Sequence, residues 1–215
     1  MSWNDKYKGN NRVWGDGPSE LAALAVRYLH EIGWGGERLC IMDVGCGYGR
    51  DAVFFTKHLN ANILGIDPSA EAIKMAQATC LGKSGIEFRQ SGFAKVGDEV
   101  FDVILVSNLY HILDRDERQR LRETLRRLLR REGLLFLGAL STNDPQEYGK
   151  GVPVPGEAHT FENEGYRHFC TRDELRRDFG FLAIRELDEH EYYEARAKGE
   201  QHHHVLWVVV GERGL

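Results

Sequence analysis

The stretch that most constrains the fold runs from Leu39 to Arg50 and reads LCIMDVGCGYGR. A short apolar run ends in an acidic residue, and three alternate glycines follow it. Because glycine lacks a Cβ, such a loop can turn at positive φ and let a ligand approach the backbone. The loop also delivers the chain to a helix N-terminus, where N–H groups await an acceptor. The stretch therefore predicts strand, glycine loop and helix, the arrangement by which an α/β sheet binds a nucleoside-bearing cofactor.

A second apolar run reinforces this prediction. Residues Asn62 to Ile66 read NILGI and end in Asp67. An acid about 20 residues beyond a glycine loop stands where its carboxylate can accept hydrogen bonds from a ribose diol. Glycine loop, second strand and terminal acid together are much stronger evidence for a nucleoside site than any one of them.

The spacing of the glycines carries a family resemblance. It is G-x-G-x-G, whereas the dinucleotide fingerprint is G-x-G-x-x-G. DVGCGYG resembles the first motif of class I S-adenosylmethionine-dependent methyltransferases, and ILGIDPS resembles their second motif. Residues 101–108, FDVILVSN, resemble the strand whose end faces the methyl-transfer site, and residues 131–137 resemble a later turn and strand. The resemblance covers residues 39–140 well and the rest more loosely.

The resemblance implies a fold, a cofactor and a set of contacts. The fold is α/β, a Rossmann-like three-layer sandwich whose seven-stranded, mostly parallel sheet ends in an antiparallel C-terminal hairpin. The cofactor is S-adenosylmethionine, and its product is S-adenosylhomocysteine. The implied cofactor-binding residues are Asp43, Gly45, Cys46, Gly47, Gly49, Asp67, Pro68, Gly92, Phe93, Ser107 and Asn108. At Ser91 to Phe93 the chain departs from the family, which often has an acid there for the adenine amino group.

Two irregular segments are candidates to cover the cleft of a single domain spanning residues 1–215. Residues 1–20 are polar but carry Trp3, Tyr7 and Trp14, so we interpret them as a flap over the cofactor; the alternative is a segment packed on the sheet. Residues 141–169 follow a parallel strand, which places them over the cleft. We interpret them as a substrate lid, against the alternative of an exposed insertion. The candidate lid residues are Tyr148, His159, Tyr166 and His168.

The end of the strand at residues 101–106 holds the candidates for catalysis. His111 is the best general base by position and by the near-neutral pKa of histidine, and Tyr110 beside it is a second candidate. The alternative is that His111 lines the cofactor at a helix start. The segment Ser107 to Tyr110 lacks the two prolines that amino-methylating nucleic-acid enzymes carry at this point, which argues against base methylation.

A charged helix is predicted over residues 114–132, with eight arginines and a leucine stripe. We interpret the arginines as a solvated outer face balanced by neighbouring acids. The net charge of −5 also argues against binding nucleic acid through the overall field. The four cysteines form no C-x-x-C pair and indicate reduced thiols in the cytoplasm. No apolar run is long enough to span a bilayer. The expected partner is a small-molecule substrate, with no membrane or nucleic acid, for a monomer or homodimer.

The C-terminal region predicts a short helix and two long strands. Thr171 to Glu174 forms a capping-box pattern for a helix ending at Phe179. Strands are predicted at residues 181–193 and 203–211, the last inserted between its neighbours, with a hairpin loop at 194–201. This region, with WGDGPSE near the start, resembles small-molecule methyltransferases of the tellurite-resistance type.

Histidines in this hairpin raise the question of a metal. His202 and His204 share a face of the predicted strand and could join His190 on its partner, but no cysteine or carboxylate spacing completes a zinc site. We therefore expect no metal and a polar strand start.

The implied activity is in-line displacement of the sulfonium methyl group by a nucleophile of a small-molecule acceptor. Three alternatives stay open: a nicotinamide-dependent oxidoreductase, which the glycine spacing disfavours; an RNA or protein methyltransferase; and a non-catalytic S-adenosylmethionine-binding protein. The acceptor atom is not specified by any motif.

Overall fold

The computed structural model describes residues 3–9, 12, 14–163, 165–195 and 201–214. The strands of the main sheet are β1 (Leu39–Val44), β2 (Ala61–Asp67), β3 (Ile86–Gln90), β4 (Phe101–Val106), β5 (Leu129–Leu140), β9 (Leu182–Ala195) and β10 (Gln201–Arg213). A small second sheet comprises β6 (Val152–Pro153), β7 (Thr160–Asn163) and β8 (Gly165–His168). The helices are α1 (Trp3–Tyr7), α2 (Glu20–Glu31), α3 (Arg50–His58), α4 (Ala70–Thr79), α5 (Arg115–Leu128) and α6 (Arg172–Asp178), with single 3₁₀ turns η1 (Trp34–Gly36), η2 (Phe93–Lys95) and η3 (Tyr110–Ile112).

The main sheet has the predicted topology. Its strand order is β3-β2-β1-β4-β5-β10-β9. Strands β1 to β5 pair in parallel, whereas β10 is antiparallel to both β5 and β9. The predicted insertion of the last strand between its neighbours is confirmed. In such a sheet the carboxyl ends of the parallel strands share one edge, where α/β proteins bind ligands.

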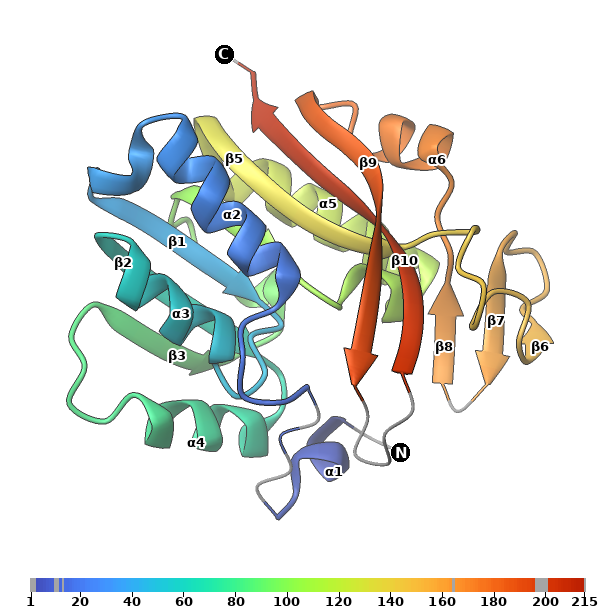
Figure 1. Cartoon of the computed structure of the whole chain (residues 1–215), viewed down its shortest axis with the longest axis horizontal. Helices are drawn as coiled ribbons and strands as arrows, with labels where there is room; N and C mark the ends of the chain where they lie inside the picture. The colour runs from blue at the N-terminus through green and yellow to red at the C-terminus, as the bar shows by residue number, and fades with distance from the viewer. Residues whose placement is uncertain (1–2, 10–11, 13, 164, 196–200, 215) are drawn as a thin grey trace.

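Helices cover both faces of the sheet, which makes the predicted three-layer sandwich. Helices α2, α3 and α4 lie on one face, and α5 and α6 lie on the other (Figure 1). Successive β1 residues serve opposite layers: Ile41 packs toward α2 and α3, and Met42 packs in the cluster that includes α5. Parallel strands buried on both faces need such continuous apolar runs.

Several helix starts follow their local sequence. Ser19 accepts a hydrogen bond from the backbone N–H of Ala22 and caps α2. Asp114 and Glu117 form a reciprocal capping box that begins α5. Thr171 caps α6 through Glu174 N, but the Glu174 carboxylate bonds to His168.

The helix predicted over residues 114–132 is shorter in the structure, because α5 ends at Leu128. Leu129 already belongs to β5, where it pairs with Phe101 of β4, and the register shifts before Val103 pairs with Leu134. Glu132 has a left-handed φ of 59° in this irregular part of the strand. Arginine and leucine favour a helix, but both can also stand at the start of a strand. The pairing of Leu129 with Phe101 therefore decides where α5 ends and β5 begins.

The segment from 141 to 169, expected to be a loop, contains the small antiparallel sheet. Strand β7 pairs with β6 and β8, and the sheet lies beyond β10, away from β1 (Figure 1). The central residues of the predicted hairpin loop, 196–200, lie outside the described residues.

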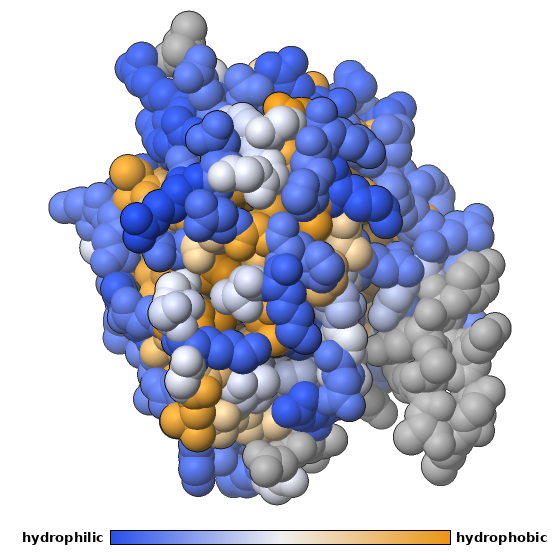
Figure 2. All heavy atoms as spheres, turned by 60° about the vertical axis from the view of Figure 1, so that its left-hand side comes forward, coloured by the Kyte–Doolittle hydropathy of each residue, from blue (hydrophilic) through white to orange (hydrophobic). Residues whose placement is uncertain are grey.

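The surface shown in Figure 2 is mainly hydrophilic, with smaller hydrophobic areas between the polar side chains. Within the described residues, no helix has both the length and the apolar character needed to cross a bilayer.

Candidate functional site

The glycine loop is folded tightly at the end of β1. The backbone N–H groups of Gly45 and Cys46 both donate to the carbonyl of Ile66, at 2.8 and 2.9 Å. Gly45, Gly47 and Gly49 have φ values of 75°, 53° and 79°, which only glycine adopts without strain. A Cβ on Gly49 would lie 2.6 Å from the ring of Phe88. The alternate glycines are therefore required both by the turn and by close packing beneath it.

Asp67 joins the loop to the end of β2. One of its carboxylate oxygens accepts a hydrogen bond from the backbone N–H of Gly47 at 3.0 Å, and the other accepts from that of Ser69 at 2.8 Å. Burial raises the pKa of this carboxyl, and the two backbone hydrogen bonds oppose the rise. The carboxylate is thus held in one orientation at the rim of the loop.

Asp43 lies under the same loop and is almost completely buried. Its Oδ2 has no hydrogen-bond partner among the described residues. Burial raises the pKa of Asp43 well above its usual value, and the nearby carboxylates Asp51 and Asp67 raise it further. Since a buried polar atom without a partner is costly, Oδ2 of Asp43 requires a donor from a ligand or water.

A cleft at this edge of the sheet gathers most of the predicted cofactor residues. Those that line it are Asp43, Gly45, Cys46, Gly47, Asp67, Pro68, Ser107 and Asn108. Gly49 lies beneath the loop, and Gly92 and Phe93 are not among the lining residues; Phe93 packs against the core cluster that includes α5. We therefore retain the adenine contact at Gly92 and Phe93 only as a prediction.

The N-terminal segment closes one side of the cleft with Trp3, Tyr7 and Trp14. The hydroxyl of Tyr48 donates to the carbonyl of Gly15 at 2.6 Å and accepts from the backbone N–H of Trp14 at 3.1 Å. Tyr48 therefore anchors the N-terminal segment to the glycine loop.

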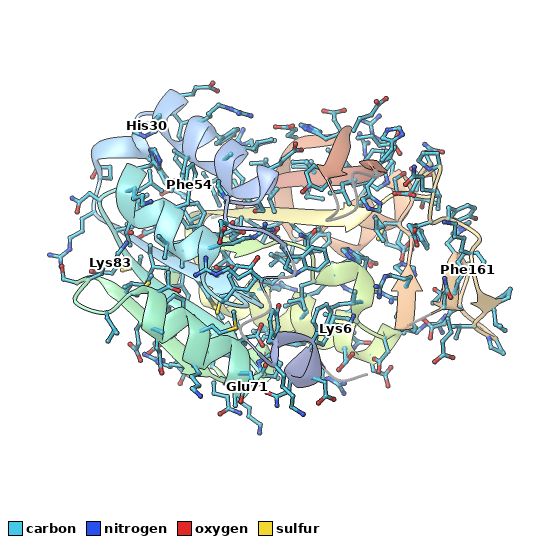
Figure 3. The ribbon with its side chains drawn as sticks, turned by 60° about the horizontal axis from the view of Figure 1, so that its bottom comes forward. Lys6, His30, Phe54, Glu71, Lys83 and Phe161 are labelled. Atoms are coloured by element: carbon cyan, nitrogen blue, oxygen red, sulfur yellow. The ribbon has the colours of Figure 1, made fainter. Side chains whose placement is uncertain are left out.

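A second anchor lies at α4. The side-chain oxygen of Asn4 accepts hydrogen bonds from Ser69 Oγ and from the backbone N–H of Glu71, both at 3.1 Å. Figure 3, in which Lys6 and Glu71 are labelled, shows α1 beside the N-terminal end of α4. Both anchors bring the segment next to the glycine loop and Asp67.

Asn108, directly after β4, connects the cofactor cleft with two further cavities. Its φ of 53° is left-handed, a conformation that asparagine tolerates better than most residues. The second cavity is lined by Trp3, Trp14, Asn108, His111, Ile112, Leu140, Glu147, Arg167, Tyr192, His204 and Leu206. The third lies between α2 and β10, and Asn108 lines it as well. A ligand in the cofactor cleft thus has two neighbouring compartments at the end of β4.

His111, the predicted general base, lines the second cavity but is a poor base. Burial lowers its pKa to about 3, and the nearby Arg167, His204 and His168 lower it further. Its Nδ1 has no hydrogen-bond partner among the described residues. His111 is therefore a neutral hydrogen-bonding group at physiological pH.

Tyr110, the second candidate, lies outside all three cavities. It is fully buried, its hydroxyl donates to Asp178 at 2.8 Å, and Arg122 donates to that hydroxyl at 2.9 Å. Burial raises the pKa of the phenol, and Asp178 raises it further. This position does not suit the catalytic role suggested for Tyr110, because its hydroxyl is already bonded to α5 and α6.

The four predicted lid residues form the framework of the small sheet instead of lining the second cavity. Tyr148 bonds to Nδ1 of His159 at 2.8 Å. Tyr166 donates to Glu157 at 2.6 Å, and Nε2 of His168 lies 2.8 Å from the Glu174 carboxylate. The cavity residues from this part of the chain are Glu147 and Arg167, which sequence reasoning did not identify. Alternation along β8 places Arg167 toward the cavity between two framework residues.

Arg118 departs from the predicted solvated face of α5. Its side chain is 5% exposed and donates to the hydroxyl of Tyr166 at 2.7 Å and to the carboxylate of Glu157 at 3.3 Å. Arg122 pairs with Asp178 at 3.1 Å. Their acidic partners, Glu157 and Asp178, lie outside α5. At least these two arginines therefore link α5 to the small-sheet region and to α6.

Two of the histidines considered for a metal are bonded to carboxylates. His204 bonds to Asp144 at 3.1 Å, His190 bonds to Glu186 at 3.0 Å, and the side chain of His202 lies outside the described part of the structure. His168, Cys170 and Glu174 each place one possible ligand atom within 4.8 Å of the others. His168 and Glu174 are already hydrogen-bonded to each other, so the cluster is explained without an ion.

Comparison with known families supports one interpretation of this geometry. Residues 41–133 match the family model described as a methyltransferase domain. The match spans β1 to the irregular start of β5 and contains the glycine loop, Asp67 and His111. A search of curated proteins found no match.

Solved structures show the same fold. An S-adenosylmethionine-dependent methyltransferase from Methanosarcina mazei is 21% identical, with 87% of this chain and 97% of that chain covered and a TM-score of 0.72. TehB from Haemophilus influenzae is 13% identical, with 98% and 67% covered and a TM-score of 0.69. The 1,6-didemethyltoxoflavin-N1-methyltransferase from Burkholderia thailandensis, solved with S-adenosylhomocysteine, is 18% identical, with 98% and 85% covered and a TM-score of 0.67.

Proposed function

We propose that this chain is an S-adenosylmethionine-dependent methyltransferase that transfers the cofactor's methyl group to a small-molecule acceptor by in-line displacement. The match of residues 41–133 to a methyltransferase domain and the fold shared with solved methyltransferases support this proposal. The cofactor supplies a methyl group already activated by the sulfonium charge. The protein therefore has to align the acceptor with that methyl group and exclude water.

The observation that carries the proposal is the buried oxygen Oδ2 of Asp43, which has no partner in a cleft formed by the glycine loop. A cofactor with an ammonium group supplies the missing donor, directly or through water. Asp67 would hold the ribose hydroxyls, and Gly45 and Gly47 would border the methionine portion. The acidic floor formed by Asp43, Asp51 and Asp67 favours a ligand that carries positive charge.

The acceptor would lie beyond Asn108, in the second cavity. Trp3, Trp14, Leu140 and Leu206 give this compartment apolar walls, and Arg167 and Glu147 add charge. A concave site that combines apolar walls with several polar side chains suits a small molecule better than a polymer. Two similar structures are named for small-molecule methylation, the toxoflavin-precursor enzyme and magnesium protoporphyrin IX methyltransferase. We further propose residues 1–20 as a flap and 141–169 as a lid in a single domain.

The free thiols of Cys40, Cys46, Cys80 and Cys170 fit a reducing compartment, and we propose the cytoplasm. The monomer or homodimer expected from the sequence stays a prediction.

The test is release of S-adenosylhomocysteine from S-adenosylmethionine in the presence of three fractions of a cell extract: low-molecular-mass filtrate, RNA and protein. We expect release with the filtrate, and loss of that release in Asp67→Ala. Release with only the RNA or only the protein fraction would contradict a small-molecule acceptor. Cofactor binding without release in any fraction would favour a non-catalytic binding protein.

A further inference from the structure

We propose that His204, oriented by Asp144, is the base that takes the acceptor's proton during methyl transfer. The inference rests on the proposed function and assigns a role within it to two residues outside the family's glycine-loop motifs. They lie 60 positions apart in the sequence, Asp144 after β5 and His204 on β10.

Asp144 is held as an anion by a complete set of donors. Its side chain has no solvent exposure. Oδ1 accepts hydrogen bonds from the backbone N–H groups of Gln146 and Glu147 at 3.0 and 2.7 Å, and Oδ2 accepts from that of Val205 at 3.1 Å. Burial alone would raise the pKa of Asp144, but the hydrogen bonds from His204, Glu147 and Val205 outweigh it, and the pKa is lowered.

An ionised carboxylate accepts hydrogen bonds only, so it determines the tautomer of its histidine partner. Nδ1 of His204 lies 3.1 Å from Oδ2 of Asp144 and must therefore carry a hydrogen. In the neutral ring the lone pair is then on Nε2, the atom that can receive a proton. The imidazolium formed afterwards would be stabilised by the adjacent anion.

The position of His204 brings this base to the acceptor. Its ring lines the second cavity, which shares Trp3, Trp14, Asn108 and Ile112 with the cofactor cleft. An acceptor in that cavity would therefore stand between the cofactor cleft and His204.

His111 lies in the same cavity but suits the role of base less well than His204. Its Nδ1 has no carboxylate partner, and burial leaves it neutral with a pKa of about 3. A group of that pKa holds a proton too weakly to serve near neutral pH. His111 can position the acceptor by a hydrogen bond, whereas His204 has an adjacent anion to stabilise its protonated form.

The charged and titratable groups around His204 come from four other parts of the fold. They are Asp144 and Glu147 after β5, His111 on η3, Arg167 and His168 on β8, and Tyr192 on β9. Asp144 is hydrogen-bonded to the ring, so its replacement perturbs His204 directly.

In the proposed reaction the acceptor's lone pair forms a bond to the methyl carbon and the carbon–sulfur bond breaks. The electron pair of that bond stays on sulfur, which becomes neutral. The acceptor's proton passes to Nε2 of His204 and later to solvent. The inference thus limits the acceptor to a nucleophile that carries a proton, namely a hydroxyl, a thiol or an amine.

The test uses phenols and thiophenols of graded acidity as probes, with S-adenosylhomocysteine release measured from pH 5 to about 9, the range over which histidine titrates. Wild type should show an acid limb in kcat/KM. His204→Gln should lose that limb and lose about 100-fold or more in rate with the least acidic probes. The loss should shrink as the probe becomes more acidic, because an ionised probe needs no base. Asp144→Asn removes the acceptor that orients the ring and should lose part of the same rate, again most with the least acidic probes.

His203→Gln is the matched control, because His203 neighbours His204 on β10 but points to the other face of the strand. It should keep the wild-type profile. An acid limb that persists in His204→Gln, or a rate loss of equal size for every probe, would overturn the inference and leave His204 a structural residue.

A readout without turnover separates this inference from the proposed function. Nitrogen-15 NMR of the S-adenosylhomocysteine complex should show His204 protonated at Nδ1 in wild type. Protonation at Nε2 alone would overturn the inference whatever the activity. Cofactor binding with no methylation of any probe would contradict both the inference and the expected acceptor class.

Discussion

The cofactor cleft and the second cavity share a border at Asn108 but are built in different ways. The cleft is formed mainly by consecutive strand ends and the loops that follow β1, β2 and β4. Its key polar contact, from Gly47 to Asp67, joins residues 20 positions apart. The second cavity combines the N-terminal segment, η3, the loop after β5, β8 and β10, and its central pair spans 60 positions.

This difference shows which part of a functional site can be predicted from local sequence. A glycine loop and its partner acid are short-range features that recur wherever the same cofactor binds, so spacing alone identifies them. The acceptor side is assembled by tertiary pairing and held by buried charged contacts, so it can change with the substrate while the cofactor side stays the same. Four predictions test this contrast, from the largest expected effect to the smallest.

The largest effect should come from Arg118→Met, which removes the buried cation that links α5 to Tyr166 and Glu157. Losing the guanidinium removes a buried donor from the Leu113 carbonyl, the Tyr166 hydroxyl and the Glu157 carboxylate, which should lower the free energy of unfolding by about 3 kcal/mol. For a chain of this size that lowers the midpoint of thermal unfolding by roughly 6–12 °C. The exposed Arg126→Met on the same helix is the control and should change stability by less than about 0.5 kcal/mol. Equal shifts in both variants would show that the small sheet does not depend on this contact.

Asp67→Ala should weaken binding of S-adenosylhomocysteine about 100-fold, or about 2.7 kcal/mol, because it removes the carboxylate that we propose as the acceptor for the ribose hydroxyls. Calorimetry measures the affinity, and circular dichroism checks that the chain stays folded. Asp67→Asn keeps one oxygen acceptor and should lose less. Unchanged affinity in the alanine variant would remove Asp67 from the cofactor site.

Tyr48→Phe tests whether the N-terminal segment belongs functionally to the cofactor cleft. The variant deletes the hydroxyl that bonds to Gly15 and Trp14. Losing these two hydrogen bonds should loosen the N-terminal segment beside the cleft. Because each bond is of modest strength, we expect cofactor binding to weaken about tenfold. Tyr28→Phe on α2 is the matched control. If Tyr48→Phe binds as tightly as wild type, the segment packs on the sheet without acting as a flap.

Asp43→Asn should stabilise the cofactor-free protein by about 1 kcal/mol near neutral pH, or a rise of roughly 2–4 °C in the unfolding midpoint. Burial raises the pKa of Asp43, so the charged carboxylate destabilises the folded state at high pH. This destabilisation is lost as the pH falls, because the carboxyl of the folded protein takes up a proton. The difference between variant and wild type should therefore shrink toward about pH 4. A difference that is constant with pH would mean that Asp43 is not destabilised by its charge. Cofactor affinity should fall in the same variant.

The sequence predicted the cofactor side and the sheet because each rests on contiguous patterns. The glycine spacing, Asp67 and the apolar run at Phe101 each lie within a short contiguous stretch, and the family resemblance that these stretches carry implies the sheet. The helix start at Thr171 was also predicted, since capping is a local contact.

The acceptor side was predicted less well for a physical reason. Nothing near Asp144 or His204 in the sequence indicates that they meet, because strand pairing between β5 and β10 brings them together. His111 was correctly placed at the end of β4, but its low pKa comes from burial and from charges on other elements. The buried Arg118 escaped notice for the same reason, since a helix of alternating charge looks solvated until its neighbours are known.

The most direct test of the central claim is calorimetric titration of the purified protein with S-adenosylhomocysteine, with NADH as the control ligand. We predict micromolar binding of S-adenosylhomocysteine, about −8 kcal/mol, and no binding of NADH. Binding of NADH alone would contradict the assignment of the cleft and indicate a nicotinamide-dependent enzyme.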